Sequence, residues 1–286
     1  MRHRLSAWLA VAARLPLAWY FLFFAGPLVL ITITSLLTRG MYGGVVWQLS
    51  FLNFARLFDS LYLMIFLKSV VLATVTAVLC MLIGFPIVWA ATAAPPQKRS
   101  LLLFLLSLPF FTNLVIRIYA LKLFTAHDGP LAYVLTLLHI EFDPFSLSQN
   151  LPLVIFGMVT SYLPFMILPL FTAFERFDDS LIDAAHDLGA NHWQTARKVL
   201  IPVLRAPLVS GFLMVFIPAL GEFVIPDLLG GAKTMLIGNL ITEQFLKARD
   251  WPFGAALTMF LIIIIGASVL IARRTPKDAN ARLVTT

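Results

Sequence analysis

The sequence predicts an all-α membrane protein with six transmembrane helices and both termini in the cytoplasm. Three observations support this fold class: an excess of apolar residues, six apolar stretches of helical length, and the distribution of basic residues. Hydrophobic residues make up 60% of the 286 residues and charged residues only 12%. Soluble domains average about 45–50% apolar and about 25% charged residues. A chain with this apolar excess is expected to lie in lipid.

Six stretches are apolar over about 20 residues, the length that a helix needs to cross the bilayer core. They cover residues 16–37, 65–93, 101–124, 151–174, 207–229 and 253–272. We expect one membrane domain at 16–272, with a cytoplasmic or interfacial lead-in at 1–15 and a cytoplasmic tail at 273–286. The longer outer connections, at 39–64 and 125–150, are too short to form further domains.

The first residues also have features of a signal peptide, because Arg2 and Arg4 precede a short apolar run that ends in Ala10-Val11-Ala12. Arg14 and another apolar stretch follow at once. This continuation favours an uncleaved amphipathic lead-in over a cleaved signal.

Basic residues set the orientation, because Lys and Arg concentrate in cytoplasmic loops. With the N-terminus inside, the inner segments hold most of the 21 Lys and Arg. These residues are Arg2, Arg4, Arg14, Lys98, Arg99, Arg176, Arg197, Lys198, Arg205, Arg273, Arg274, Lys277 and Arg282. The net charge of +7 is therefore interpreted as membrane topology, and no nucleic-acid partner is expected.

The polar segment between the fourth and fifth stretches has the pattern of a structured loop. Ser180 and Asp183 have the spacing of a capping box. Gly189 is suited to end that helix, and Asn191 with Gln194 repeats the capping pattern. The pattern predicts a helix, a glycine turn and a second helix at the inner membrane surface. The residues alone leave two roles open: docking on a cytoplasmic partner, or shielding of the bundle itself.

The same segment resembles the EAA motif of ABC importer permeases, E-A-A-x-x-x-G-x(9)-I-x-L-P. Asp183 stands at the Glu position, Ala184, Ala185 and Gly189 match, and Val199, Ile201 and Pro202 stand at the I, L and P positions. Residues 108–124, 221–239 and 249–256 are similar to the permeases of spermidine and putrescine importers. From the first span to the sixth, the chain thus resembles the inner-membrane component of a binding-protein-dependent transport system.

This resemblance implies the ABC importer type I (MetI-like) permease fold, in the bacterial inner membrane, with a cytoplasmic coupling loop at 175–206. It implies that the loop docks on a dimer of ATPase subunits. The implied coupling residues are Asp183, Ala184, Ala185, Asp187, Gly189, Ile201 and Pro202. The other implied partners are a second homologous permease, an external (periplasmic) substrate-binding protein, membrane lipid and a polyamine substrate, spermidine or putrescine.

No P-loop is present in the sequence. The nearest string is Gly230-Gly231-Ala232-Lys233-Thr234, in which Ala precedes Lys and the upstream glycine spacing fails. We therefore expect no enzyme activity and no cofactor in this chain, with ATP and Mg²⁺ bound by the partner ATPase. The five His are scattered, so no metal site and no catalytic residues are expected.

Two carboxylates near the outer end of the fifth stretch are candidates for the substrate pathway. An ionisable group in a span costs about 2.5–3.5 kcal/mol on insertion scales and normally faces a cavity or a partner. Glu222 and Asp227 would lie about 140° apart on a continuous helix. Asp227 therefore faces the pathway only if the helix breaks near Pro226, and otherwise it reaches outer water.

The remaining pathway candidates are polar or aromatic. Asn113 and Arg117 are four residues apart and share a helical face. Asn113 is predicted to line the pathway, whereas Arg117 would repel a polyamine and is predicted to pair with Glu222 or Asp227. Tyr162 and Trp251 could offer aromatic faces to a cation, or could serve as interfacial anchors.

Three alternatives to a polyamine permease stay open at this point. A permease for thiamine, iron or an opine-type compound would have the same architecture. A stand-alone secondary transporter or channel would leave the polar segment unexplained. A membrane enzyme would need a site that the sequence does not reveal.

Overall fold

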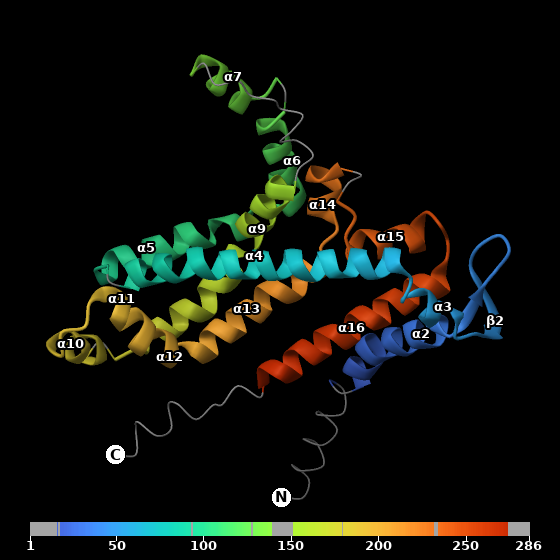
Figure 1. The fold of residues 1–286 in the computed structure, drawn as a ribbon, viewed down its shortest axis with the longest axis horizontal. Coiled ribbons are helices and arrows are strands. Elements are labelled where there is room, and N and C mark those ends of the chain that lie inside the picture. The colour runs from blue at the N-terminus through green and yellow to red at the C-terminus, as the bar shows by residue number, and fades with distance from the viewer. Residues whose placement is uncertain are drawn as a thin grey trace, which may run out of the picture. The chain divides into compact units, whose positions relative to one another are not determined.

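The computed structural model describes residues 16, 18–92, 94–126, 128–138, 151–178, 180–231 and 234–273 (Figure 1). The chain divides into two compact units. The first consists of Met1–Met64 and Leu240–Ile263, and the second of Ile65–Asn239 and Ile264–Thr286. The predicted lead-in at 1–15 and nearly all of the predicted tail lie outside the described residues.

The first unit contains a short β-hairpin that the all-α prediction missed. The first apolar stretch forms η1 (Phe21–Ala25) and α2 (Gly26–Ser35), and the chain then pairs β1 (Leu37–Arg39) antiparallel with β2 (Val45–Leu49). Gly43 and Gly44 make the turn at φ values of 92° and 79°, which glycine adopts without a Cβ penalty. Valines and a tryptophan directly after this turn favour a strand. Helix α3 (Leu52–Arg56) follows.

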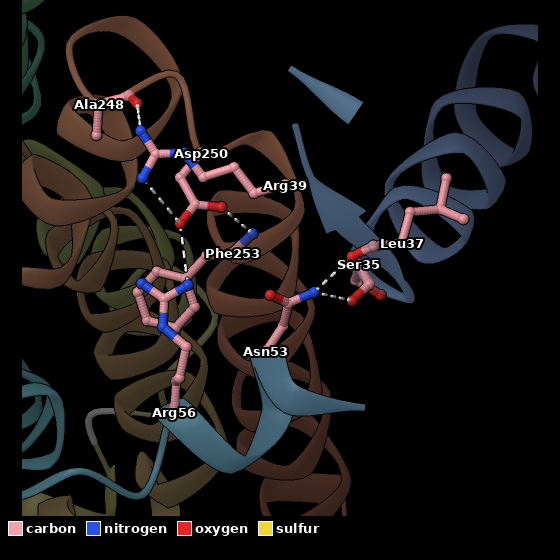
Figure 2. A network of polar contacts seen from close by, with 8 residues as sticks. All are labelled: Ser35, Leu37, Arg39, Asn53, Arg56, Ala248, Asp250 and Phe253. Atoms are coloured by element: carbon pink, nitrogen blue, oxygen red, sulfur yellow. Dashed lines mark hydrogen bonds and ion pairs between the residues drawn. The ribbon is translucent and has the colours of Figure 1, made fainter. Parts of the chain in front are cut away.

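A buried carboxylate connects the elements of the first unit (Figure 2). Asp250 is 1% exposed and precedes α16 (Trp251–Arg273). It accepts a hydrogen bond of 2.9 Å from Arg56 Nη1 and lies 3.9 Å from Arg39 Nη1. Its other oxygen accepts from the backbone N–H of Phe253 at 3.2 Å, and the Arg56 guanidinium stacks 3.9 Å from the centroid of the Phe253 ring. Asp250 thus ties the hairpin and α3 to the start of α16.

The second unit is built around α9 (Leu151–Phe174), whose Met166 is fully buried. A Cβ at Gly84, on α4 (Ser60–Thr92), would lie 3.2 Å from Met166 Cγ. A Cβ at Gly211, on α13 (Arg205–Leu220), would lie 2.7 Å from the Met166 sulfur. Small residues therefore let both helices approach α9 closely, as is usual between membrane helices. Figure 1 shows α13 running beside α9.

Helices α5 (Pro96–Ser107), η2 (Leu108–Phe111), α6 (Leu114–Phe124) and α7 (Pro130–Leu137) lie between α4 and α9 in the sequence. The coupling segment forms α10 (Ser180–Asp187), α11 (His192–Thr195), η3 (Ala196–Leu200) and α12 (Ile201–Val203). Helix α14 (Val224–Leu229) follows α13, and α15 (Ile237–Leu246), which was not predicted, precedes α16.

Among the described residues, four helices are long and apolar enough to cross a membrane: Ala18–Ser35, Ser60–Thr92, Leu151–Phe174 and Trp251–Ala272. A fifth is added if His192–Val203 and Arg205–Leu220, which meet at 76°, count as one span. Neither of the apolar stretches 101–124 and 207–229, each predicted as a span, forms one continuous helix. The first is interrupted before Leu114 and the second after Leu220, because polar side chains at both points bind the backbone N–H groups of the next helix.

We expect Asp250→Ala to destabilise the first unit by about 1–3 kcal/mol, because a partly buried Arg56 loses its hydrogen-bonded partner. The midpoint of thermal unfolding in detergent measures this effect. Asp59→Ala, which removes an exposed carboxylate of the same unit, is the matched control and should leave the midpoint nearly unchanged. Equal midpoints for the two variants would contradict the role given to Asp250.

Candidate functional site

The coupling segment 180–203 has the predicted order of helix, glycine turn and helix. Helix α10 ends in a Schellman motif: Ala190 N–H donates to the carbonyl of Ala185 at 2.9 Å, and Gly189 N–H donates to that of His186 at 2.8 Å. Gly189 has a φ of 80°, which explains the need for glycine at this position of the motif. The predicted helix stop at Gly189 is confirmed.

The two helix starts in this segment differ in how well they match the prediction. Asn191 and Gln194 form a complete capping box, with hydrogen bonds of 2.9 and 3.0 Å between each side chain and the other residue's backbone N–H. The predicted capping box of Ser180 and Asp183 is not among the hydrogen bonds of the described residues. Instead, Asp178 accepts a hydrogen bond from Ser180 N–H at 3.0 Å. Hydrogen bonds from the Ser180 hydroxyl and backbone hold the pKa of Asp178 below its usual value.

The coupling segment presents large apolar side chains to solvent. Leu188 is 88% exposed and Trp193 73% exposed. Asp183, Ala184, Asp187, Ile201 and Pro202 are also exposed, whereas Ala185 is buried. Exposed large apolar side chains grouped on one surface often mark an interaction site. The structure thus brings the predicted coupling residues onto one segment with an apolar surface.

The break between α13 and α14 is closed by the carboxylate of Glu222, which is only 7% exposed. Its Oε1 accepts hydrogen bonds from the backbone N–H groups of Phe223, Val224 and Ile225, at 3.0, 2.8 and 3.3 Å. These are the donors that the start of a helix leaves without partners. The negative charge also lies at the positive end of α14. The break therefore lies at Gly221–Phe223, and Pro226 stands within the first turn of α14.

The other oxygen of Glu222 accepts a hydrogen bond from the hydroxyl of Tyr162, a buried residue of α9. Arg117, on α6, interacts electrostatically with Tyr162. The predicted direct ion pair of Arg117 with Glu222 or Asp227 is not among the ion pairs of the described residues, which all involve Asp250. Tyr162 thus contacts Glu222 directly and interacts with Arg117 electrostatically.

The start of α15 supports the same break from another side. Asn239 Nδ2 donates to the carbonyl of Phe223 at 2.8 Å. A Cβ at Gly238 would lie 2.5 Å from the Gly221 carbonyl oxygen and 2.8 Å from that of Glu222. A residue larger than glycine at position 238 would therefore push the backbone at Gly221 and Glu222 away from α15.

A second capped break precedes α6. The Oδ1 of Asn113 accepts from the backbone N–H groups of Val115 and Ile116, at 2.9 and 3.3 Å. Helices α6 and α14 then meet at α9, where a Cβ at Gly157 would lie 2.8 Å from Leu229 and 3.6 Å from Ile118. The two short helices α6 and α14 thus pack against the same face of α9 at Gly157.

The other predicted pathway residues lie on α14 and at the start of α16. Asp227 is exposed on α14. Trp251 is 50% exposed at the start of α16, in the first unit. Sequence reasoning missed Asp250, although its place directly before a long apolar stretch is a helix-capping signal.

Within the described residues, no group of three or more His, Cys, Asp or Glu could hold a metal ion. The rings of His186 and His192 are in edge-to-face contact, 5.3 Å apart. This contact joins α10 to α11 across the glycine turn.

A family model for the inner membrane component of binding-protein-dependent transport systems matches residues 97–275. The spermidine/putrescine transport system permease protein PotB of Salmonella typhimurium is 41% identical over 265 residues, which cover 93% of this chain and 92% of that protein. The protein of the same name from Haemophilus influenzae is 37% identical over 266 residues, 93% of each chain.

A chain of the bacterial alginate ABC transporter, solved in complex with an alginate pentasaccharide-bound periplasmic protein, matches with a TM-score of 0.73 at 19% identity. The alignment covers 100% of this chain and 98% of that chain. The fold is therefore the helical membrane permease fold of ABC importers, the MetI-like fold.

We expect Glu222→Ala to lower stability by about 1–3 kcal/mol, because three helix N–H groups and a buried hydroxyl lose their acceptor. Glu222→Gln keeps an acceptor oxygen and should cost less than half as much. Thermal unfolding of the two variants in detergent measures the difference, with Asp227→Asn as the exposed control. Normal stability of Glu222→Ala would show that the cap does not hold the break.

Proposed function

This chain belongs to the family of binding-protein-dependent transport system inner membrane components, and we propose that it is the permease subunit of an ATP-driven importer for polyamines. A polyamine substrate is supported by sequence identity: over 93% of its length, the chain is 37–41% identical to permeases named for spermidine and putrescine. A permease for thiamine, iron or an opine-type compound is the alternative within the same fold, and no observed contact favours it.

The coupling segment is proposed to dock on the ATPase subunits in the cytoplasm. Leu188 and Trp193 offer an exposed apolar surface of the kind that an interface buries. The Schellman turn at Gly189 and the capping box at Asn191 fix the two helices relative to one another. Such a segment can transmit the motion of a partner as a rigid body, opening the cavity outward and later releasing substrate inward.

Six spans with both termini in the cytoplasm are proposed from the four unbroken helices and two broken ones. Helices α5 and α6 would form the third span, and α13 and α14 the fifth. Broken helices are tolerated at membrane depth where the free backbone groups find partners in the protein. Asn113 and Glu222 supply these partners. Helix α13 rises about 24 Å from Arg205 to Leu220, which supports a position for Glu222 in the outer part of a bilayer core about 30 Å thick.

Asp227 is our proposed pathway carboxylate, because it is exposed on the first turn of α14 while the oxygens of Glu222 bind other groups of the protein. Asn113 is exposed at the third span's break and is proposed to line the pathway with it. We propose that Tyr162 and Arg117 act by positioning Glu222. Trp251 is retained as a candidate aromatic face for a cation.

A single acid and few aromatic faces make a weak cation site, which suits a permease because tight binding would slow release. Selectivity would then rest mainly with the external binding protein. The proposed assembly comprises this chain, a second related permease, two ATPase subunits that bind ATP and Mg²⁺, and the binding protein.

We expect proteoliposomes that contain the complete complex to accumulate labelled spermidine or putrescine, dependent on ATP and on the binding protein. Unlabelled thiamine and ferric iron should not compete, whereas the second polyamine should. Accumulation of one of these other solutes without any uptake of polyamine would contradict the proposed substrate.

Leu188→Asp should reduce co-purification of the ATPase at least about tenfold, because it places a charge in the proposed apolar interface. Leu246→Asp is the matched control, since Leu246 is 73% exposed on α15 and lies outside the coupling segment. Equal ATPase recovery with both variants would contradict docking through this segment.

A further inference from the structure

A polar cavity of about 380 Å³ lies where the end of α4, the start of α5, the end of α9 and α10 come together. Its polar lining consists of Thr92, Arg99, Glu175 and Asp183, and aromatic rings form the rest of its wall together with Ile182. The cavity is distinct from the break at Glu222. It lies beside the coupling segment and includes one of that segment's two acidic residues, Asp183.

Arg99 is incompletely satisfied in this cavity. Its Nη2 donates to the carbonyl of Thr92, the last residue of α4. Its Nε is buried and has no hydrogen-bond partner among the described residues. A buried donor without a partner carries a desolvation penalty. The side chain is thus held at one end of α4 with a second donor still available.

The two carboxylates of the cavity are not paired with Arg99 in this conformation, because both ion pairs within 4.0 Å among the described residues involve Asp250. Glu175 directly follows α9 and is anchored to it by a backbone bond of 2.9 Å to Phe171. Asp183 lies in the first turn of α10 and is exposed. Of the two acids, Asp183 is the one that moves with the coupling segment.

We propose that Arg99 is a positioning residue, which pairs with Asp183 when an ATPase subunit docks and thereby joins the coupling segment to the ends of α4 and α5. This inference rests on the proposed docking of residues 180–203. Docking removes water from Asp183, and a carboxylate that loses water needs a cation or hydrogen-bond donors. Arg99 is the only cation among the residues that line the described cavity.

The pair would make the motion of the ATPase act on two membrane helices in addition to the chain's own connections to α9 and α13. It also gives the acidic position of the motif a role inside the permease. Asp183 can then face Arg99 while Leu188 and Trp193 face the partner.

A charge exchange tests the pair in the complete complex in proteoliposomes. Arg99→Glu and Asp183→Arg should each lower the polyamine uptake per ATP hydrolysed about tenfold, the size of a typical coupling between contacting charges. The double variant Arg99→Glu/Asp183→Arg should recover to within about threefold of the native ratio. Lys98→Glu makes the same charge change at an exposed neighbour that does not line the cavity and should leave the ratio unchanged.

Failure of the exchange to restore the ratio would overturn the proposal, as would recovery with Arg99→Glu/Glu175→Arg in its place. An equal loss with Lys98→Glu would also overturn it, because the effect would then be one of general charge.

Disulfide trapping gives a measurement that does not depend on activity. Arg99→Cys with Asp183→Cys, in a Cys80→Ala background, should form a disulfide faster with the ATPase bound than without it. A rate that is the same in both states would overturn the proposal. If the Leu188→Asp variant still binds the ATPase fully, that result refutes the proposed docking of residues 180–203, on which the Arg99 pair rests. Normal docking with no change in trapping refutes the Arg99 pair alone.

Discussion

Three backbone N–H groups and one tyrosine hydroxyl meet at the carboxylate of Glu222, and the path of the chain from α13 to α14 depends on this arrangement. Lipid offers no hydrogen bonds, so a helix that breaks inside a membrane must find partners within the protein. A carboxylate can accept several bonds at once and also opposes the positive end of the following helix. Tyr162, on α9, donates a hydrogen bond to the second oxygen of Glu222. Gly238 leaves room for the backbone at Gly221 and Glu222. The short helix α14, with Asp227 on its exposed side, is placed by these contacts.

The same principle operates at Asn113, where an amide oxygen caps α6. Both short helices pack at Gly157 of α9. This matters for a cationic substrate, because the free N-terminus of a half-helix repels positive charge. Glu222 offsets that charge at α14. Capped helix starts thus occur both at the break between α13 and α14 and in the segment 180–203, where Asn191 and Gln194 cap α11.

The two features that the sequence predicted best depend on neighbouring residues, whereas two contacts that it missed join residues far apart in the chain. The turn at Gly189 and the capping box of Asn191 and Gln194 were predicted correctly. In each case the residues that end or begin the helix lie within one helical turn of it in the sequence. The break before α14 was predicted five residues late, since Pro226 is a familiar helix breaker but is tolerated in a first turn. The pairing of Arg117 stays a prediction, and the contact of Tyr162 with Glu222 was missed because Tyr162 lies on another helix, 60 residues away in the chain. Asp250 was missed because its partner Arg56 is 194 residues away.

A double-mutant cycle of Tyr162→Phe and Glu222→Ala tests most directly whether Glu222 acts through its contacts in the break. Unfolding free energies in detergent should give a coupling of about 1–2 kcal/mol between the two changes, the range for groups that share one buried hydrogen bond. The single variants should keep the fold, so the coupling can be measured on assembled protein. Strict additivity of the two changes would contradict the account, because it would mean that Tyr162 and Glu222 do not support the break together.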